Sequence, residues 1–277
     1  ELGLEIPETT NSAGGAISFS SEPKETEVHH AHFPKRMSFT QFMAFRTCPL
    51  QYKFAHIYRL PVFGSATLSF GKSLHALFER ALRERVNDKL APLPNFETLL
   101  AWLPECWIDE WYEDDQEREK YLTVARTAAR AFIADCRKNE AQPAFLEQPF
   151  SIKIGEFSVK GRIDRIDRLA AGGYEIIDYK TGKPKDLERL KKDRDLRLQL
   201  VLYSLAASEV LGLDIRSLTY YYTDNGSRAT IAATEKDRLQ LKEEIQEIGA
   251  QILASSFSPT AGDHCKYCDF KTICEFR

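Results

Sequence analysis

Cysteines near the two ends of the chain constrain its fold more than any other feature. Cys265, Cys268 and Cys274 form a C-x2-C-x5-C array at the C-terminus, and Cys48 stands in the segment TCPLQYKF near the other end. Thiolates at C-x2-C spacing bind zinc or an iron–sulfur cluster, and the spacing alone does not distinguish the two. We therefore expect a metal site that ties the first helix to the last segment and contributes to the folding free energy.

The other two cysteines, Cys106 and Cys136, lie within helical patterns and are expected to be small core residues. No run of the sequence is long and apolar enough to span a bilayer, and nothing resembles a cleavable signal. These features favour a cytoplasmic protein without a membrane partner. In that reducing compartment the cysteines would not form disulfides.

Composition divides the chain into two parts. Residues 1–36 are rich in Ser, Thr, Glu, Gly and Pro, which predicts a disordered linker or the trimmed edge of a longer chain. Residues 37–277 have the composition of one folded domain. The net charge of −3 gives no overall nucleic-acid signature. A basic run at 183–197 follows the acidic segments described below, and it is either a contact for a phosphate backbone or a solvated helix face.

The hydrophobic patterns predict helices first, then strands, then an alternation of the two. Helical patterns cover residues 38–48, with Ser38 or Thr40 as the N-cap, and then 73–84, 97–112 and 119–138, before Pro143 and Pro149 mark the change to strands. Strand patterns at 156–167 and 174–180 are joined by a turn at 170–173. A helix at 196–212, strands at 217–223 and 228–233, and a helix at 235–255 complete an α/β domain with a small central sheet.

Two acidic strand segments carry the chemistry. In a strand Asp164 points away from Ile163, and Asp178 shares a face with Lys180, so Asp164 meets Asp178 and Lys180 if the two strands pair in antiparallel fashion. Two converging carboxylates suit Mg2+ or Mn2+, and the lysine can hold or deprotonate a water or steady a pentavalent phosphate. A surface ion pair is the structural alternative, but charges within an apolar strand need partners. Asp167 points to the opposite face and is excluded from the site.

These motifs, in this order, resemble the PD-(D/E)xK nucleases of the RecB type. The resemblance is carried by G-x-x-x-H (Gly71–His75), G-x-x-D (Gly161–Asp164), I-D-Y-K-T-G (Ile177–Gly182) and Q-L-x-L-Y (Gln199–Tyr203). With the cysteines, they resemble the subgroup with a 4Fe-4S cluster, which includes AddB-type recombination nucleases and CRISPR-associated adaptation nucleases. Residues from Arg36 to the end also resemble nuclease domains fused to superfamily 1 helicases of the UvrD and RecB kind.

The resemblance implies a restriction-endonuclease-like core, with a small mixed sheet flanked by helices and an N-terminal helical region. It implies that His75, Asp164, Asp178 and the Tyr179 carbonyl bind metal, that Lys180 is catalytic, and that Gln199 and Tyr203 support the site and contact substrate. Cys48, Cys265, Cys268 and Cys274 would hold the 4Fe-4S cluster.

The function implied is a Mg2+- or Mn2+-dependent deoxyribonuclease, an exonuclease on single-stranded DNA ends that works with a helicase in the same or a partner chain during DNA repair or recombination. No Walker A motif is present in the sequence, so the helicase motor would lie outside it. A stand-alone CRISPR-type adaptation nuclease and a catalytically inactive DNA-binding module of the same fold are the alternatives.

Overall fold

The computed structural model describes residues 36–276, apart from 183, 185, 186, 233 and 255. The described residues belong to one compact unit, Pro34–Arg277. The segment predicted to be a linker lies outside the described residues except for Arg36. Within the described part of the chain, every helix is too short or too polar to cross a membrane.

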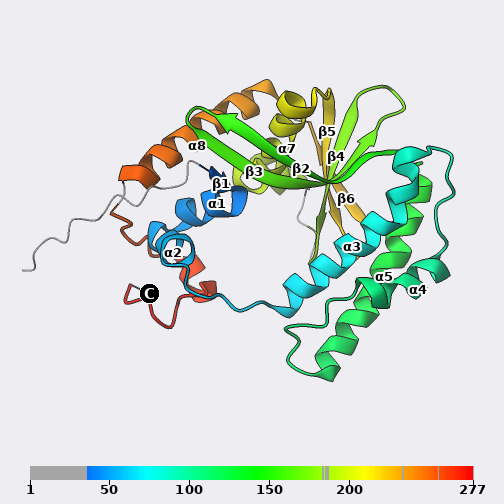
Figure 1. The fold of residues 1–277 in the computed structure, drawn as a ribbon, viewed down its shortest axis with the longest axis horizontal. Coiled ribbons are helices and arrows are strands. Elements are labelled where there is room, and N and C mark those ends of the chain that lie inside the picture. Colours follow the sequence, from blue (N-terminus) through cyan, green and yellow to red (C-terminus); the bar gives the residue numbers. More distant parts are fainter. Residues whose placement is uncertain (1–35, 183, 185–186, 233, 255, 277) are drawn as a thin grey trace, which may run out of the picture. The chain divides into compact units, whose positions relative to one another are not determined.

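A mixed sheet of six strands forms the centre of the unit (Figure 1). The strands are β1 (Arg36–Ser38), β2 (Pro143–Ile154), β3 (Phe157–Arg168), β4 (Tyr174–Lys180), β5 (Ile215–Tyr222) and β6 (Ser227–Ile231). Their order is β1-β3-β4-β5-β6, and β2 pairs with β3. The β1–β3 and β4–β5 pairs are parallel, and the β2–β3, β3–β4 and β5–β6 pairs are antiparallel. The predicted mixed α/β fold with helices flanking the sheet is confirmed.

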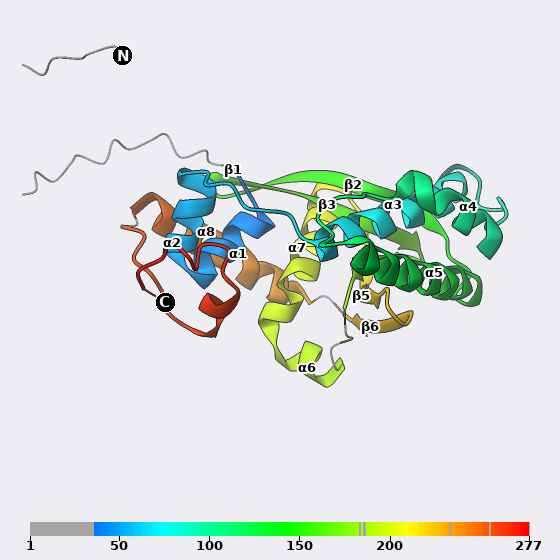
Figure 2. The same ribbon diagram turned by 90° about the horizontal axis from the view of Figure 1, so that it is seen from below.

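Helices pack on both faces of this sheet. They are α1 (Phe39–Thr47), α2 (Pro49–Tyr52), the π-helical turn η1 (Lys53–Ile57), α3 (Ala66–Asn87), α4 (Phe96–Cys106), α5 (Asp115–Lys138), α6 (Leu187–Lys192), α7 (Arg194–Leu211), α8 (Glu235–Ala254) and the 3-10 turn η2 (Asp263–Tyr267). One face is covered by α3, α4 and α5, while α7 contacts β2, β4 and β5, and α8 packs on α7 and α1 (Figures 1 and 2). Ser38 caps α1 in a reciprocal pair of hydrogen bonds with Gln41.

The main hydrophobic core lies between α3, α5 and the sheet. Phe78 of α3 and Phe132 of α5 stack with ring centroids 3.8 Å apart. The Tyr179 and Tyr221 rings meet these phenylalanines edge to face from β4 and β5. Cys136 is fully buried in this core and Cys106 packs against it, as expected for small apolar residues. The core therefore fixes α3 and β4, which both carry candidate site residues.

Two local predictions are wrong. The helix expected over 97–112 ends at Cys106, Trp107 is extended, and Trp111 has a left-handed φ of 67°. Pro104 near the end of α4 supplies no backbone N–H, which weakens the last helical turn. Pro143 marks the change to strands as predicted, because β2 begins at it, but Pro149 lies inside β2, and the sequence patterns predict no strand at 143–154. In the described residues β2 pairs with β3 alone, and such an edge position tolerates proline.

Candidate active site

The site begins where β3 and β4 separate. Their ladder runs from Arg168↔Tyr174 to Arg165↔Ile177, and Asp164 and Asp178 are the next residues beyond its last pair. Both carboxylates are buried. Beyond the ladder, the Tyr179 N–H donates to Asp164 Oδ2 at 2.8 Å instead of to a strand carbonyl. The fork between the strands thus creates an opening with two carboxylates at its base.

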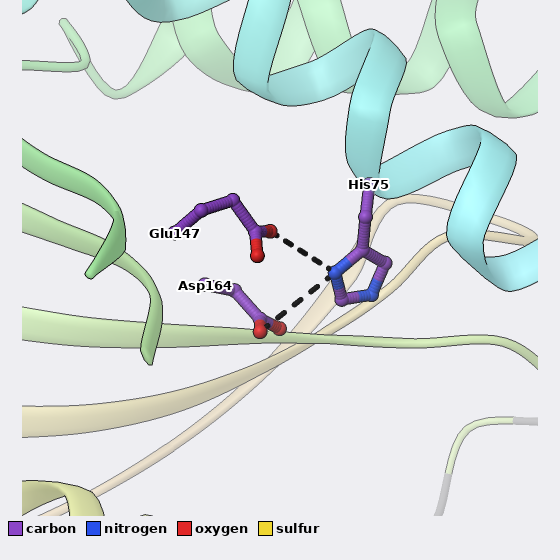
Figure 3. A group of neighbouring side chains, drawn as sticks. All are labelled: His75, Glu147 and Asp164. Carbon is purple, nitrogen blue, oxygen red and sulfur yellow. Dashed lines mark hydrogen bonds and ion pairs between the residues drawn. The ribbon is translucent and has the colours of Figure 1, made fainter. Parts of the chain in front are cut away.

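Three side chains from three elements meet at this fork (Figure 3). His75 of α3 directs Nδ1 at Glu147 Oε1, 3.3 Å away, and at Asp164 Oδ1, 3.7 Å away. These residues form the one group of at least three His, Cys, Asp or Glu in the described chain whose ligand atoms all lie within 4.8 Å of one another. Imidazole and carboxylate groups at this separation are suited to hold a divalent cation.

Glu147 is the residue that the sequence motifs did not single out. The pairs Leu146↔Arg165 and Gln148↔Ile163 place it opposite Asp164 in the β2–β3 ladder. Its φ of 46° is left-handed, a conformation that non-glycine residues adopt at a cost and that occurs often at functional sites. The sequence signal for Glu147 is its position in a strand. If residues 143–154 are recognised as a strand that pairs with β3, Glu147 lies beside Asp164.

A second chain of contacts extends from Asp178 toward α7. The Lys180 ammonium lies 2.7 Å from Asp178 Oδ2 and donates to Gln199 Oε1 at 2.7 Å. Gln199 in turn donates through Nε2 to the Tyr203 hydroxyl at 2.8 Å, one helical turn further along α7. The structure thus joins Asp178, Lys180, Gln199 and Tyr203 in one network. This network lies beside the group of His75, Glu147 and Asp164, the candidate metal-ligand group.

The pKa values of the groups at the fork are shifted, because several acidic side chains lie close together there and are largely shielded from solvent. Burial, followed by the charge of Asp178, raises the pKa of Asp164 to about 7. Burial also raises the pKa of Asp178, although the neighbouring Lys180 opposes this shift. For His75, burial lowers the pKa, but the hydrogen bond to Glu147 and the surrounding carboxylates raise it overall. A bound cation would relieve the repulsion among these carboxylates.

Two hollows meet at the site. One, of about 720 Å³, is lined by His75 and Glu147, and the other, of about 330 Å³, is lined by Lys180 and Gln199. Thr181 lines both hollows. The metal-ligand group and the lysine are therefore each open to a space that an extended ligand can enter.

Asp167 lies outside the site, as its strand position predicts. Arg165 donates through Nε to Asp167 Oδ1 at 2.6 Å, and both side chains are buried on the face opposite to Asp164. Cys136 Sγ lies 3.6 Å from the same guanidinium. This ion pair supports β3 from behind the fork.

The four cysteines predicted to bind a cluster line a single cavity together with Phe54 and His264. Cys48 lies at the junction of α1 and α2, and the C-terminal segment with the other three lies beside it in both views (Figures 1 and 2). Cys48 Sγ accepts a hydrogen bond from the Thr260 N–H at 3.4 Å. In the described chain no three of the four sulfur atoms lie within 4.8 Å of one another, so the cysteines share the lining of the cavity without forming a close group.

Three side chains of the basic run at 183–197 form ion pairs within the fold. Lys191 pairs with Glu188 at 2.9 Å, Arg194 pairs with Glu244, and Arg197 lies 3.7 Å from Asp237. These contacts attach α6 and α7 to neighbouring acidic groups. Lys191 thus lies on a solvated helix face, whereas Arg194 and Arg197 join α7 to α8 through partly buried pairs, and all three have partners other than a phosphate.

Comparison with known proteins identifies the family of this arrangement. The model of the PD-(D/E)XK nuclease superfamily matches residues 36–275. Two proteins of Streptococcus pyogenes, each named as a subunit of an ATP-dependent helicase/deoxyribonuclease, are 27% and 26% identical over 211 residues, which is 72% of this chain and 19% of theirs. A putative exonuclease from Eubacterium rectale has a similar fold, with a TM-score of 0.51 and 12% identity over 92% of this chain and 93% of that one. The chain thus spans about a fifth of the length of the curated relatives it matches.

Proposed function

Because the chain belongs to the PD-(D/E)XK nuclease superfamily, we propose that it is a metal-dependent deoxyribonuclease that hydrolyses single-stranded DNA from its ends. The observation that carries this proposal is the convergence of His75, Glu147 and Asp164 at the fork, with Asp178 and Lys180 beside them. A group of ligands next to a cationic amine matches the needs of phosphodiester hydrolysis.

The donor set suits Mg2+ or Mn2+. His75, Glu147, Asp164, Asp178 and the Tyr179 carbonyl would hold the ion, and oxygen donors with one imidazole fit such hard cations. Asp178 Oδ2 is buried with the Lys180 ammonium 2.7 Å away, and this carboxylate would share its charge between the lysine and the ion. When bound, the ion would lower the pKa of a water and neutralise charge on the phosphate.

Lys180 would stabilise the pentavalent phosphate and orient the attacking water. Its ammonium is fixed between Asp178 and Gln199, and the Tyr220 ring centroid lies 5.1 Å away. A cation held in place before the reaction stabilises developing negative charge without reorganising. Gln199 and Tyr203 act as positioning residues, because their contacts fix the direction of the lysine side chain.

The experiment compares the purified chain with its Lys180→Ala and Asp178→Ala variants on end-labelled single-stranded DNA. Wild-type protein should release short products with Mg2+ or Mn2+ and stop with EDTA. Each variant should lose activity by a factor of about 10² or more, as usual for one member of a cooperating site. Lys153→Ala, an exposed change at the far end of β2, is the control and should cleave normally. Activity that survives in either site variant excludes this assignment.

We also propose that the cysteine cavity holds a 4Fe-4S cluster. A tetrahedral zinc site with Zn–S bonds of about 2.3 Å brings its sulfur atoms within about 4 Å of one another. A four-iron cluster is larger and holds its thiolates further apart, and Cys48, Cys265, Cys268 and Cys274 line one cavity without three sulfur atoms within 4.8 Å of one another. Anaerobically purified protein should be brown and contain iron, whereas colourless protein with stoichiometric zinc would exclude the cluster.

The relatives are named as subunits of an ATP-dependent helicase/deoxyribonuclease, which supports a role beside a helicase, and we propose that this role belongs to DNA repair or recombination. We propose that this chain is the C-terminal nuclease domain of a larger helicase–nuclease, or works with a motor on a partner chain. The purified chain should then degrade single-stranded DNA but leave blunt duplex DNA intact until a helicase and ATP are added. Equal cleavage of both substrates without a helicase would contradict this partnership.

A further inference from the structure

The larger hollow at the site continues as a groove along one face of α3. Its floor includes Ser65, Leu68, Lys72 and His75, while the opposite face of α3 is buried in the core. From His75 to Ser65 the helix rises about 15 Å, so the groove leads away from the metal-ligand group toward the start of α3. Lys72 is exposed and forms no ion pair with another described residue. Arg162 lies across the groove with a largely exposed side chain, and its one ion pair among the described residues is with Glu147, 3.7 Å away. Two basic side chains along a groove are suited to a phosphate backbone.

Gly71 keeps this groove open one helical turn from His75. Glycine inside a helix is less stable than alanine, so its presence there needs a reason. A Cβ at Gly71 would have Thr181 Cγ2 as its nearest neighbour, at an ordinary contact distance of 3.7 Å. Contacts within the protein therefore do not require glycine at this position. A ligand backbone that approaches the helix closely would require it.

An exposed aromatic pair stands where the groove ends. Phe63 is 81% exposed and Trp111 is 50% exposed, and their rings meet edge to face with centroids 6.1 Å apart. The indole packs against Gly64, one residue before Ser65 at the groove's end. Exposed rings beside a basic groove provide stacking surfaces for unpaired bases, which a duplex does not offer.

Resting on the proposed nuclease function, we propose that this groove binds the single-stranded DNA substrate. The backbone passes over Gly71 toward Asp164, Lys72 and Arg162 contact phosphates, and an unpaired base stacks on Phe63 and Trp111. Phe63 and Trp111 are thus binding residues that lie outside the catalytic network and favour a single strand over a duplex.

The test measures binding of a fluorescent oligothymidylate and of an abasic oligonucleotide of the same length, by anisotropy in EDTA. Phe63→Ala should weaken binding of oligothymidylate about fivefold or more and leave binding of the abasic strand unchanged. Phe63→Tyr keeps a ring and should bind both strands as wild type does. Leu90→Ala, a change at another highly exposed apolar residue outside the groove, is the control for unspecific effects.

Gly71→Ala provides a second, independent measurement. It should raise the melting temperature, since alanine favours the helix, and yet weaken binding of both oligonucleotides. The inference is overturned if Phe63→Ala binds both strands as wild type does or weakens both equally, or if Gly71→Ala binds normally. Because no cleavage occurs in EDTA, these results are independent of catalysis. A protein that shows the expected binding but does not cut DNA with metal would instead overturn the proposed function.

Discussion

Glu147 and Asp167 are acidic neighbours of Asp164 whose contacts give them different roles. Glu147 faces His75 across the fork, whereas Asp167 is enclosed with Arg165 on the other side of the sheet. The alternation of side chains along β3 is enough to separate Asp164 from Asp167. It cannot reveal Glu147, whose place depends on pairing with a second strand.

We predict that Glu147→Gln weakens metal binding, because the amide keeps the shape of the side chain but removes its negative charge. Mn2+ affinity, measured by titration calorimetry, should fall about 10- to 100-fold, the usual cost of disturbing a metal site. Circular dichroism should show an unchanged fold. Wild-type Mn2+ affinity in this variant would remove Glu147 from the ligand set.

Asp167→Asn should lower the stability of the fold and leave metal binding unchanged, the reverse of what is expected for Glu147→Gln. It leaves the Arg165 guanidinium, which is 2% exposed, without its charged partner, and breaking a buried ion pair costs about 3–5 kcal/mol. Urea unfolding should show this loss, while the folded protein binds Mn2+ as wild type does. An unchanged midpoint of unfolding would contradict the role of the pair in supporting β3.

At the scale of the elements, α3 connects the core to the site. Leu74, Leu77 and Phe78 are fully buried on one face, and His75 projects from the other. This division follows from the periodicity of the sequence, as do α5, α7, α8 and the β3–β4 hairpin. β2 does not follow from it, because its prolines are signals of a loop and only its edge position makes them compatible with a strand.

The separation of β3 and β4 at the fork could not be predicted from the sequence either. Alternation predicts that Asp164 meets Asp178, but the end of the ladder at Arg165↔Ile177 depends on how α3, α7 and the neighbouring strands pack around it. That end frees the Tyr179 N–H to bind Asp164. The individual site residues can therefore be recognised in the sequence, but the opening between them depends on tertiary packing.

We predict that Leu77→Ala lowers the free energy of unfolding by about 2–5 kcal/mol, as expected for a cavity in a packed core. Its side chain belongs to the core face of α3 and lines no part of the groove. Cleavage rate per folded molecule should therefore stay near that of wild type at a temperature well below the unfolding transition. A large fall in this rate without loss of stability would mean that the core face of α3 also sets the position of His75.

At the scale of the whole molecule, the cysteine cavity joins segments separated by more than two hundred residues. Cys48 follows α1, and its nearest cysteine partner in the cavity by sequence is Cys265. The spacing of the cysteines predicts ligands and a connection between the two ends. It does not predict the surrounding cavity, whose walls include Phe54 and Phe270, in T-shaped contact with centroids 5.5 Å apart.

The cysteine cavity shares no lining residue with the two hollows at the fork, which predicts a structural role for the cysteine site. Cys268→Ser removes one ligand, and the loss of such a cross-link should cost about 2–5 kcal/mol by analogy with a native disulfide. The melting temperature should then fall by about 5–15 °C. The residues proposed to hold metal and phosphate at the fork are untouched, so DNA cleavage should fall only as far as the folded fraction does. Cys106→Ser, at a cysteine outside the cavity, is the matched control and should keep its iron. If Cys268→Ser protein is fully folded by circular dichroism yet cuts no DNA, the site takes part in substrate binding or catalysis and is more than a connection between the two ends.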